Sequence, residues 1–376
     1  MSQTIYPIGI QNFEKIRKDG YLYIDKTALV YQLVTTGQYY FLSRPRRFGK
    51  SLLLSTLEAY FQGKKELFEG LAMEKLEKDW KEYPILHFDL NISQYDSPDS
   101  LYKILNDILS RYEDEYGTRP SEVTLPLRFA GIIDRAYRKT GQRAVILIDE
   151  YDKPLLQNLH DEEMQNRLRN MLKPFYGVLK TMDRAIRFAL LTGVTKFGKI
   201  SVFSDLNQLK DISMDERYAT ICGITDEEME ANFRPDMERL AKKMNVAYEN
   251  IRDRMRRTYD GYQFCQNSEG VYNPFSVLNA LDSQEFSYYW FATGTPTFLV
   301  ELLKGSDYDL RDLEGVEVGG FLMMSYLSLS YIKMFYQCGF LTITSYDDRF
   351  DLYTLNYPNE EAKHYLQQCQ LQAQRA

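Results

Sequence analysis

The amino-acid sequence predicts an α/β fold in which a parallel sheet carries helices on both faces. In the first two-thirds of the chain, short apolar runs alternate with longer amphipathic segments, which is the pattern of strand-helix-strand units. One apolar run leads into a glycine-lysine-serine turn, and another ends in two adjacent carboxylates. Because ligands of open α/β sheets bind at the carboxyl ends of strands, these features indicate a site at one edge of the sheet.

The expected strands are the short apolar runs. They cover residues 39–43, 84–90, 144–148 and 188–192, with a weaker one at 209–212. Over residues 51–61, leucines and aromatic residues recur at helical spacing, and Gly63 follows as a stop signal. We expect the apolar face of this helix to lie on the sheet.

The last third of the chain has a different pattern. After about Cys222 the strands stop, and Thr225 with Glu228 forms a capping box that opens a run of helices reaching roughly residue 303. From 329 to 358 a helix is followed by two apolar runs around an acidic turn at 347–350, which indicates a winged helix. The predicted division is an α/β domain at 1–222, a helical lid subdomain at 223–305, a winged-helix-like region at 306–360 and a polar tail at 361–376.

Composition and charge exclude several functional classes. A net charge of -7 with a pI near 5.3 gives no global attraction to nucleic-acid phosphates. The 4 cysteines form no CxxC pair and only 3 histidines accompany them, so we expect no structural zinc site and a reducing, cytoplasmic setting.

Residues 1–9 lack the pattern of a secretory signal. The apolar region 318–332 is interrupted by glycines and serines, so we expect buried helix and turn there and no membrane span.

The sharpest motif is SRPRRFGKS at residues 43–51, between an expected strand and an expected helix. Backbone N–H groups and the helix dipole converge on such a loop, a lysine neutralises phosphate charge, and a serine hydroxyl completes a magnesium shell. We therefore predict a P-loop, or Walker A motif, with Lys50 on the phosphates and Ser51 on Mg²⁺. The predicted nucleotide-binding residues are Arg46, Arg47, Phe48, Gly49, Lys50, Ser51 and Leu52.

The loop departs from the usual G-x4-G-K-[ST] pattern at its first position, where Arg44 replaces glycine. If that position needs a positive φ angle, arginine carries a steric cost that glycine avoids, so we expect the loop to differ in shape at its entry. Arg46 and Arg47 either add charge-assisted contacts to phosphate or to a carboxylate, or form a solvated basic turn.

Two further strands end in polar side chains. The apolar run 144–148 leads into Asp149 and Glu150, which predicts a Walker B arrangement: Asp149 holds magnesium through water and Glu150 polarises an attacking water. The alternative is an acidic turn that leaves the core. The run 188–192 presents Thr192, and beyond it Thr195, as competing candidates for a residue that senses the γ-phosphate.

The strand at 84–90 contributes weaker candidates. Asp89 ends it, and His87 within it is interpreted as a buried, hydrogen-bonded histidine and not as a ligand. On a later helix Arg252, Arg254, Arg256 and Arg257 form a basic cluster. It is interpreted as a solvated face, with an arginine finger as the alternative.

Several segments resemble the bacterial AAA-ATPase-like proteins, which are related to the archaeal ATPase and STAND groups of P-loop NTPases. The resemblance covers nearly the whole chain and implies ATP as the nucleotide, with Arg44 as a loop variant typical of the family. The matching segments are YPIGI at 6–10, YIDKT at 23–27, RPRRFGKS at 44–51, LIDEYDKP at 147–154, YDGY at 259–262 and YNPFS at 272–276.

The resemblance also implies a C-terminal PD-(D/E)XK nuclease domain in many members. The segment YPNEE at 357–361 is similar to the family's junction, and we find no PD…ExK constellation in the sequence, because Pro235 and Asp236 lie in a strongly helical stretch. Contact with nucleic acid is therefore expected only by family association, and the acidic turn of the expected wing would repel phosphate.

The sequence thus predicts an ATP-binding, magnesium-dependent, ATP-hydrolysing regulatory module, with Lys50, Glu150 and Thr192 as catalytic residues and Ser51 and Asp149 as metal ligands. Its partners would be the nucleotide and either a protein partner or a second copy of the chain. A non-hydrolysing scaffold that binds nucleotide or protein, and the ATPase half of a DNA-processing nuclease, are the alternatives.

Overall fold

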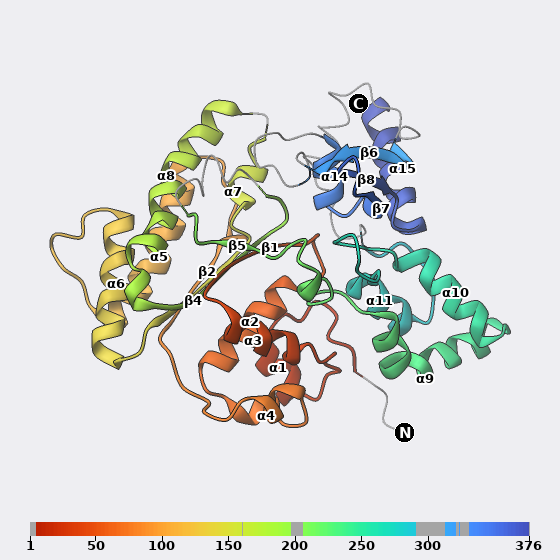
Figure 1. Cartoon of the computed structure of the whole chain (residues 1–376), viewed down its shortest axis with the longest axis horizontal. Coiled ribbons are helices and arrows are strands. Elements are labelled where there is room, and N and C mark those ends of the chain that lie inside the picture. Colours follow the sequence, from red (N-terminus) through yellow and green to blue (C-terminus); the bar gives the residue numbers. More distant parts are fainter. Residues whose placement is uncertain are drawn as a thin grey trace. The chain divides into compact units, whose positions relative to one another are not determined.

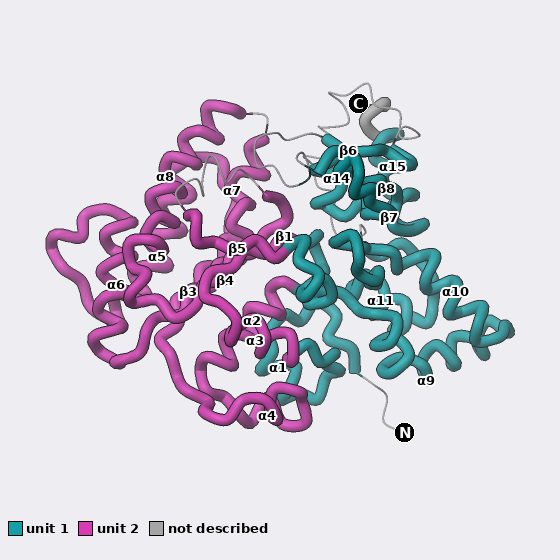
Figure 2. Tube along the Cα trace, viewed as in Figure 1, with its two compact units in different colours: residues 1–26, 44–49, 213–376 teal, residues 27–43, 50–212 magenta. Residues whose placement is uncertain are grey.

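The computed structural model describes residues 5–159, 161–196, 206–290, 313–320, 323 and 331–375, and the chain packs into two compact units. Unit 1 comprises Met1–Lys26, Arg44–Gly49 and Ser213–Ala376, and unit 2 comprises Thr27–Ser43 and Lys50–Ile212 (Figure 2). The units therefore interleave along the sequence. The domain boundaries expected from the sequence stay predictions.

Unit 2 is built on a parallel sheet, as the sequence predicts. In the described residues it has five strands in the order β2-β3-β4-β1-β5 (Figure 1). Each expected strand is present, and β3 extends one residue further to include Asp149. The strands are β1 (Tyr39–Ser43), β2 (Ile85–Asp89), β3 (Ala144–Asp149), β4 (Ile186–Gly193) and β5 (Lys210–Asp211).

Helices cover both faces of this sheet, which confirms the predicted α/β class. Helix α3 (Lys50–Phe61) packs against β3 and β4, whereas α5 (Pro98–Tyr116) and α6 (Leu125–Thr140) pack against β2 and β3 from the other side (Figure 1). The central strands β1 and β3 are buried along their whole length, as parallel strands between helix layers must be. The remaining helices of unit 2 are α2 (Thr27–Thr36), α4 (Ala72–Leu76), α7 (Lys153–Leu156) and α8 (Glu162–Thr181), with short 3-10 turns at Lys65–Phe68, Leu90–Ile92 and Asp183–Ala185.

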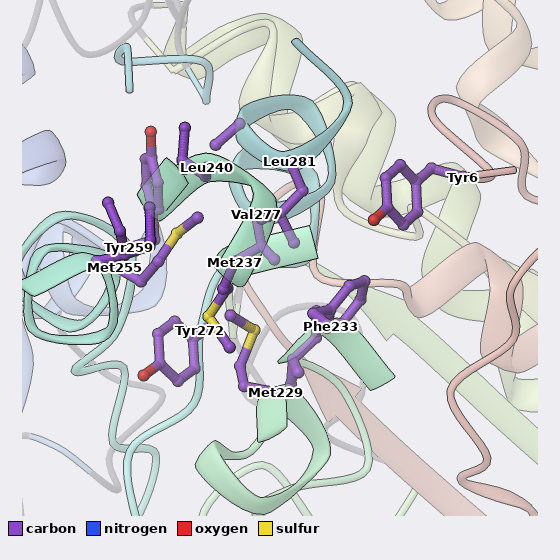
Figure 3. Close-up of a cluster of buried hydrophobic side chains, with 14 residues drawn as sticks. Tyr6, Met229, Phe233, Met237, Leu240, Met255, Tyr259, Tyr272, Val277 and Leu281 are labelled. Atoms are coloured by element: carbon purple, nitrogen blue, oxygen red, sulfur yellow. The ribbon is translucent and has the colours of Figure 1, made fainter. Parts of the chain in front are cut away.

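Three helices of unit 1 share one apolar core (Figure 3). They are α9 (Asp226–Met244), α10 (Tyr248–Tyr259) and α11 (Pro274–Ser283), and Tyr6 joins their core from the N-terminal segment. The predicted capping box opens α9: Thr225 Oγ1 accepts from Glu228 N at 3.2 Å, and a Glu228 carboxylate oxygen accepts from Thr225 N at 2.8 Å. A 3-10 turn at Glu216–Tyr218 precedes α9, and α1 (Phe13–Lys18) also belongs to this unit.

A small antiparallel sheet lies in the C-terminal part of unit 1. Its order is β6-β8-β7, with β6 (Val316–Gly319), β7 (Thr342–Asp347) and β8 (Leu352–Asn356). The predicted helix and hairpin are present as α14 (Tyr331–Gln337), β7 and β8, and α15 (Glu360–Arg375) follows them. Strand β6 was not predicted. The winged-helix interpretation stays a prediction, and most of region 318–332 lies outside the described residues.

Two of the four arginines in the basic cluster of α10 form ion pairs, whereas Arg257 is exposed. Arg252 and Arg256 both bind the carboxylate of Asp226, in the first turn of α9. Burial opposes ionisation of that carboxyl, but hydrogen bonds from the two arginines outweigh it and lower the pKa of Asp226. The Arg254 guanidinium lies 4.2 Å from the ring centroid of Phe286. These contacts give Arg252, Arg254 and Arg256 a packing role within unit 1.

Among the described helices, none combines the length and the apolar character that crossing a membrane requires.

Glu361 is a buried carboxyl that makes stability depend on pH. It lies in the first turn of α15 and accepts hydrogen bonds from Ser276 Oγ at 2.8 Å and from Trp290 N at 3.0 Å. Burial is the largest cause that raises its pKa to about 7, from 4.5. A carboxyl with a raised pKa contributes its full stability below the unfolded-state pKa and loses it as pH rises through the folded-state value.

We expect Glu361→Gln, which stays neutral, to gain thermal stability relative to the wild type as pH rises from about 5 to about 8. Thermal denaturation of both proteins across this range measures the difference. Glu360→Gln, a change at the exposed neighbouring residue, is the control and should show no such trend. A stability difference between Glu361→Gln and wild type that does not vary with pH would contradict this account.

Candidate functional site

The first turn of α3 places a lysine and a serine at the edge of the unit 2 sheet. Strand β1 ends at Ser43 and α3 begins at Lys50, so both side chains belong to a helix that follows the carboxyl end of a buried strand. The side chain of Lys50 is only 4% exposed, and its Nζ lies 3.5 Å from Glu150 Oε1. Ser51 Oγ donates a hydrogen bond to Asp149 Oδ2 at 2.5 Å.

The Asp149 carboxylate at the end of β3 joins two neighbouring elements. Besides Ser51 on α3, Thr192 on β4 binds it, with Thr192 Oγ1 donating to Asp149 Oδ1 at 2.6 Å. Strands β1, β3 and β4 are parallel, so their carboxyl ends meet at one edge. The structure thus brings together the five side chains for which the sequence predicts catalytic or metal-binding roles.

Glu150 occupies an unusual backbone conformation. Its φ angle is 52°, in the left-handed region that non-glycine residues rarely adopt. The turn is held by hydrogen bonds from Glu150 N to Asp149 Oδ1 at 3.0 Å and from Tyr151 N to Thr192 O at 3.0 Å. Such strain persists only where its surroundings fix it, and it occurs often at functional sites. Here the turn directs the Glu150 carboxylate towards the Lys50 ammonium.

Asp152 is a further residue of this edge, to which sequence reasoning gave no role. It is fully buried and accepts hydrogen bonds from Thr195 N at 2.6 Å, Thr195 Oγ1 at 2.7 Å and Val194 N at 3.1 Å. Gly193 permits this approach, because a Cβ there would lie 2.5 Å from Asp152 Oδ1. Asp152 therefore joins the turn after β3 to the residues at the end of β4 by hydrogen bonds.

The two candidate threonines have different partners. Thr192 binds the Asp149 carboxylate and Thr195 binds that of Asp152. Burial, followed by the nearby charge of Glu150, raises the pKa of Asp152 to about 6. The sequence did contain a signal for Asp152, because this third carboxylate follows Asp149 and Glu150 closely. Its partner Thr195 could not be predicted from local spacing.

The segment Arg44–Gly49 joins β1 to α3, and the position of Arg44 does not need a positive φ angle. The positive φ angles fall on Arg47, at 70°, and on Gly49, at 93°. Arg44 is instead buried, and its guanidinium donates to the backbone oxygens of Ser213 at 2.8 Å and Tyr218 at 3.1 Å. An arginine is accommodated there because its side chain has these acceptors.

The other predicted loop residues differ in exposure. Arg46 and Arg47 are exposed, whereas the Phe48 ring is 1% exposed and would offer a ligand only its backbone. Leu52 is half-buried on α3. In the part of the chain that the structure describes, no atom outside the adjacent residues lies within 4 Å of the place a Cβ on Gly49 would take, so the loop is open there.

The weaker candidates on β2 have local partners. Asp89 stands opposite Asp149 in the strand register, and its carboxylate accepts from Asn91 N at 2.8 Å. His87 Nδ1 lies 3.1 Å from Glu58 Oε2. Burial lowers the pKa of His87, but the Glu58 carboxylate outweighs this effect and raises it. Among the described residues, no group of three or more His, Cys, Asp or Glu side chains is arranged to hold a metal ion.

Comparisons with known proteins show the family to which this chain is related. The model of a family described as predicted AAA-ATPase matches residues 7–203. A protein of Azotobacter chroococcum mcd 1, described as an uncharacterized protein in the vnfD 5' region, is 40% identical over 369 residues, which cover 96% of this chain and 69% of that protein. The solved ORC2 protein of Aeropyrum pernix, in ADPNP and ADP complexes, matches with a TM-score of 0.32 and 11% identity over 92% of this chain and 94% of that one, too low a score to support any argument.

We expect Asp152→Ala to lower the free energy of unfolding by about 2 to 4 kcal/mol, because it leaves buried N–H groups of Val194 and Thr195 without their acceptor. Asp152→Asn, which keeps one acceptor oxygen, should lose less. Urea unfolding of both variants measures the difference. Equal stability of the alanine and asparagine variants would contradict this role for Asp152.

Proposed function

Because this chain belongs to the predicted AAA-ATPase family, we propose that unit 2 binds ATP with Mg²⁺ and hydrolyses the ATP as part of a regulatory module. Family membership establishes the coarser function, that of a nucleotide-binding, ATPase-like protein. One observation supports the finer proposal above all others. A lysine, two hydroxyls and two carboxylates converge at the edge of a sheet where α/β proteins bind ligands.

Lys50 is the proposed phosphate-binding cation. Its ammonium is almost completely buried and has the Glu150 carboxylate at 3.5 Å as a counter-charge. A triphosphate at the open loop beside Gly49 would supply a stronger counter-charge to Lys50. The first turn of α3 would add the positive end of the helix dipole. We infer that Lys50 exchanges Glu150 for phosphate oxygens when ATP binds, which frees the Glu150 carboxylate.

The donor set at Asp149 suits a hard divalent cation. Ser51 Oγ and the two Asp149 oxygens are all oxygen ligands, and Mg²⁺ is usually held by one or two carboxylates together with substrate phosphates and water. We propose that Ser51 and Asp149 hold Mg²⁺, which would neutralise charge on the phosphate oxygens.

Glu150 is the proposed general base and Thr192 a polar group at the γ-phosphate. A carboxylate freed from Lys50 could accept a proton from an attacking water, as acid–base residues of phosphoryl-transfer sites do. Thr192 Oγ1 orients the Asp149 carboxylate and lies at the same strand end. Asp152 would act only indirectly, by holding the turn that presents Glu150.

The regulatory part of the proposal concerns unit 1. Residues 223–305 are proposed as a lid and 306–360 as a winged-helix-like region that responds to the nucleotide, with a protein partner or a second copy of the chain as the effector. The wing turn carries Asp347, Asp348 and Asp351 against Arg349, which disfavours nucleic-acid phosphate as a partner. The nuclease alternative is supported by resemblance alone.

We expect Mg²⁺-ATP to raise the thermal denaturation temperature of the wild type by several degrees, on the order of the effect of a ligand well above its Kd. Lys50→Ala should show no such shift, because it removes the cation that faces the phosphates. Lys180→Ala, at an exposed lysine of α8, is the control and should respond like the wild type. Mg²⁺-GTP in parallel tests base preference. Equal stabilisation of wild type and Lys50→Ala by ATP would refute the site.

We expect Glu150→Gln to retain ATP binding but to release phosphate about 100-fold more slowly than the wild type, since it cannot accept a proton from water. Phosphate release at saturating ATP, together with calorimetric binding, separates the two effects. If the wild type binds ATP but releases no phosphate, the non-hydrolysing scaffold is the better description. If the variant hydrolyses ATP as fast as the wild type, Glu150 is not the base.

A further inference from the structure

The phosphate-binding loop packs as part of unit 1, although both elements that it joins belong to unit 2. Strand β1 and helix α3 lie in unit 2, and the segment Arg44–Gly49 between them lies in unit 1. The chain therefore passes between the units at residues 43–44 and again at 49–50, directly before Lys50. Whatever fixes this segment in unit 1 also acts, through a single peptide bond, on the lysine and serine of the proposed site.

Arg44 anchors the start of the segment. Its guanidinium donates to the backbone oxygens of Ser213 and Tyr218 and lies 4.1 Å from the ring centroid of Phe264. A buried guanidinium is stable only when its N–H groups find acceptors, and backbone carbonyls with an aromatic face supply them here. Arg44 thus has an anchoring role that glycine could not provide.

The middle and end of the segment have aromatic partners. The Phe48 ring centroid lies 4.7 Å from that of Tyr262, 5.7 Å from that of Phe264 and 6.2 Å from that of Trp290. The Trp290 indole N–H donates to Arg46 O at 3.0 Å, and the Arg47 guanidinium lies 4.4 Å from the ring centroid of Phe275. These four aromatic residues, Tyr262, Phe264, Phe275 and Trp290, are called the socket from here on.

Two of the four socket residues lie in sequence motifs to which the proposed ATP chemistry gives no role. Tyr262 ends the YDGY segment at 259–262, and Phe275 lies in the YNPFS segment at 272–276. The two segments are joined by the hydrogen bond from Asn273 N to Tyr259 O at 2.9 Å. The two segments therefore form one hydrogen-bonded structure that contacts the loop.

The third motif, YPNEE at 357–361, is hydrogen-bonded to the same two segments and to Trp290. Asn359 Nδ2 donates to Asp260 O at 2.7 Å, and Glu361 binds both Ser276 Oγ and Trp290 N. A Cβ on Gly261 would lie 2.2 Å from Pro358 O, so only glycine allows the first and third motifs this close. The three segments hold the socket as one hydrogen-bonded assembly.

A second glycine, Gly339, lies in close contact with the loop segment inside unit 1. Gly339 has a φ of 86°, and a Cβ on it would lie 2.7 Å from the Trp290 ring and 2.8 Å from Pro45 Cγ. Both the left-handed backbone and the close contact require glycine here. The segment Arg44–Gly49 is thus held at Arg44, Pro45, Arg46, Arg47 and Phe48 by residues that are distant in the sequence.

We propose that the socket positions the phosphate-binding loop, so that Arg44 and Phe48 act as positioning residues for Lys50 and Ser51, and ATP binding is coupled through the loop to the packing of unit 1. This inference rests on the proposed function. A loop that must keep one shape to bind phosphate binds it more tightly when that shape is held in advance. Coupling is reciprocal, so a nucleotide that favours one loop conformation also favours the socket arrangement that fits it.

Trp290 offers a direct test, because the chain has only 2 tryptophans, Trp80 and Trp290. In a Trp80→Phe background, emission reports on the indole that binds Arg46 O. We expect Mg²⁺-ATP to change this emission, and the change to saturate with the Kd that calorimetry gives for the same protein. The Lys50→Ala variant in this background should give neither calorimetric binding nor an emission change.

Variants of the anchors test positioning. Phe48→Leu and Arg44→Gly should each weaken ATP binding about tenfold, although the latter restores the usual P-loop glycine. Phe233→Leu, which removes a buried ring of unit 1 outside the socket, is the matched control and should bind ATP like the wild type. Trp290→Phe keeps a ring but loses the bond to Arg46 O, and should weaken binding about fivefold even if the other variants fail to fold.

The outcomes separate this inference from the proposed function. If calorimetry finds no ATP binding by the wild type, the proposed function fails and the inference with it. If the wild type binds ATP but Trp290 emission does not change, or if folded Phe48→Leu or Trp290→Phe binds with unchanged affinity, the inference is overturned and the proposed function stands. Loss of affinity in Phe233→Leu equal to that in Phe48→Leu would also overturn it, because general destabilisation of unit 1 would then explain both.

Discussion

The buried carboxylate of Asp149 is the interaction on which the geometry of the site depends. It accepts hydrogen bonds from the Ser51 hydroxyl on α3, the Thr192 hydroxyl on β4 and the Glu150 peptide N–H. A charge in a buried position is tolerated only when such donors compensate its lost hydration. The same donors fix how three separate elements meet at the sheet edge. The groups that hold this edge together are therefore those that the proposed nucleotide and cation would engage, and their binding would replace the Lys50–Glu150 contact and the Ser51–Asp149 hydrogen bond.

The second constraint is that the loop before Lys50 is folded by another unit. In an isolated strand-loop-helix unit, the loop takes its shape from glycines and from the helix that follows it. Here Gly49 supplies the local backbone freedom, but Arg44 and Phe48 pack the remainder of the loop against residues of unit 1. The segment Arg44–Gly49 thus has two sources of order, one local and one distant. This is the physical basis for the coupling that we propose between the nucleotide and unit 1.

Much of the α/β core and its site could be predicted because the signals are local. The strand at 39–43, the helix after it and the acidic pair that ends the strand at 144–148 are read from periodicity and motif spacing, and the parallel-sheet rule then places their ends together. What could not be predicted depends on pairs that are distant in the sequence. Asp152 with Thr195, Arg44 with Ser213, and strand β6 with β8 leave no local pattern. The sequence could not show whether the position of Arg44 needs a positive φ angle for the same reason, since the acceptors of Arg44 lie far along the chain and the left-handed residue is Arg47.

The departure from the usual P-loop pattern can now be given a physical reason. Replacing the first glycine by arginine removes conformational freedom from the loop entry, which would be a disadvantage if the loop had to find its shape alone. In this chain the arginine side chain supplies the fixed shape that a flexible glycine could not, because its guanidinium is bound by three backbone carbonyls and an aromatic face. Rigidity then comes from tertiary contact, and it can be released by any event that moves those carbonyls or that ring. In the proposed function, such a loop would respond to the state of unit 1, as a nucleotide-dependent switch requires.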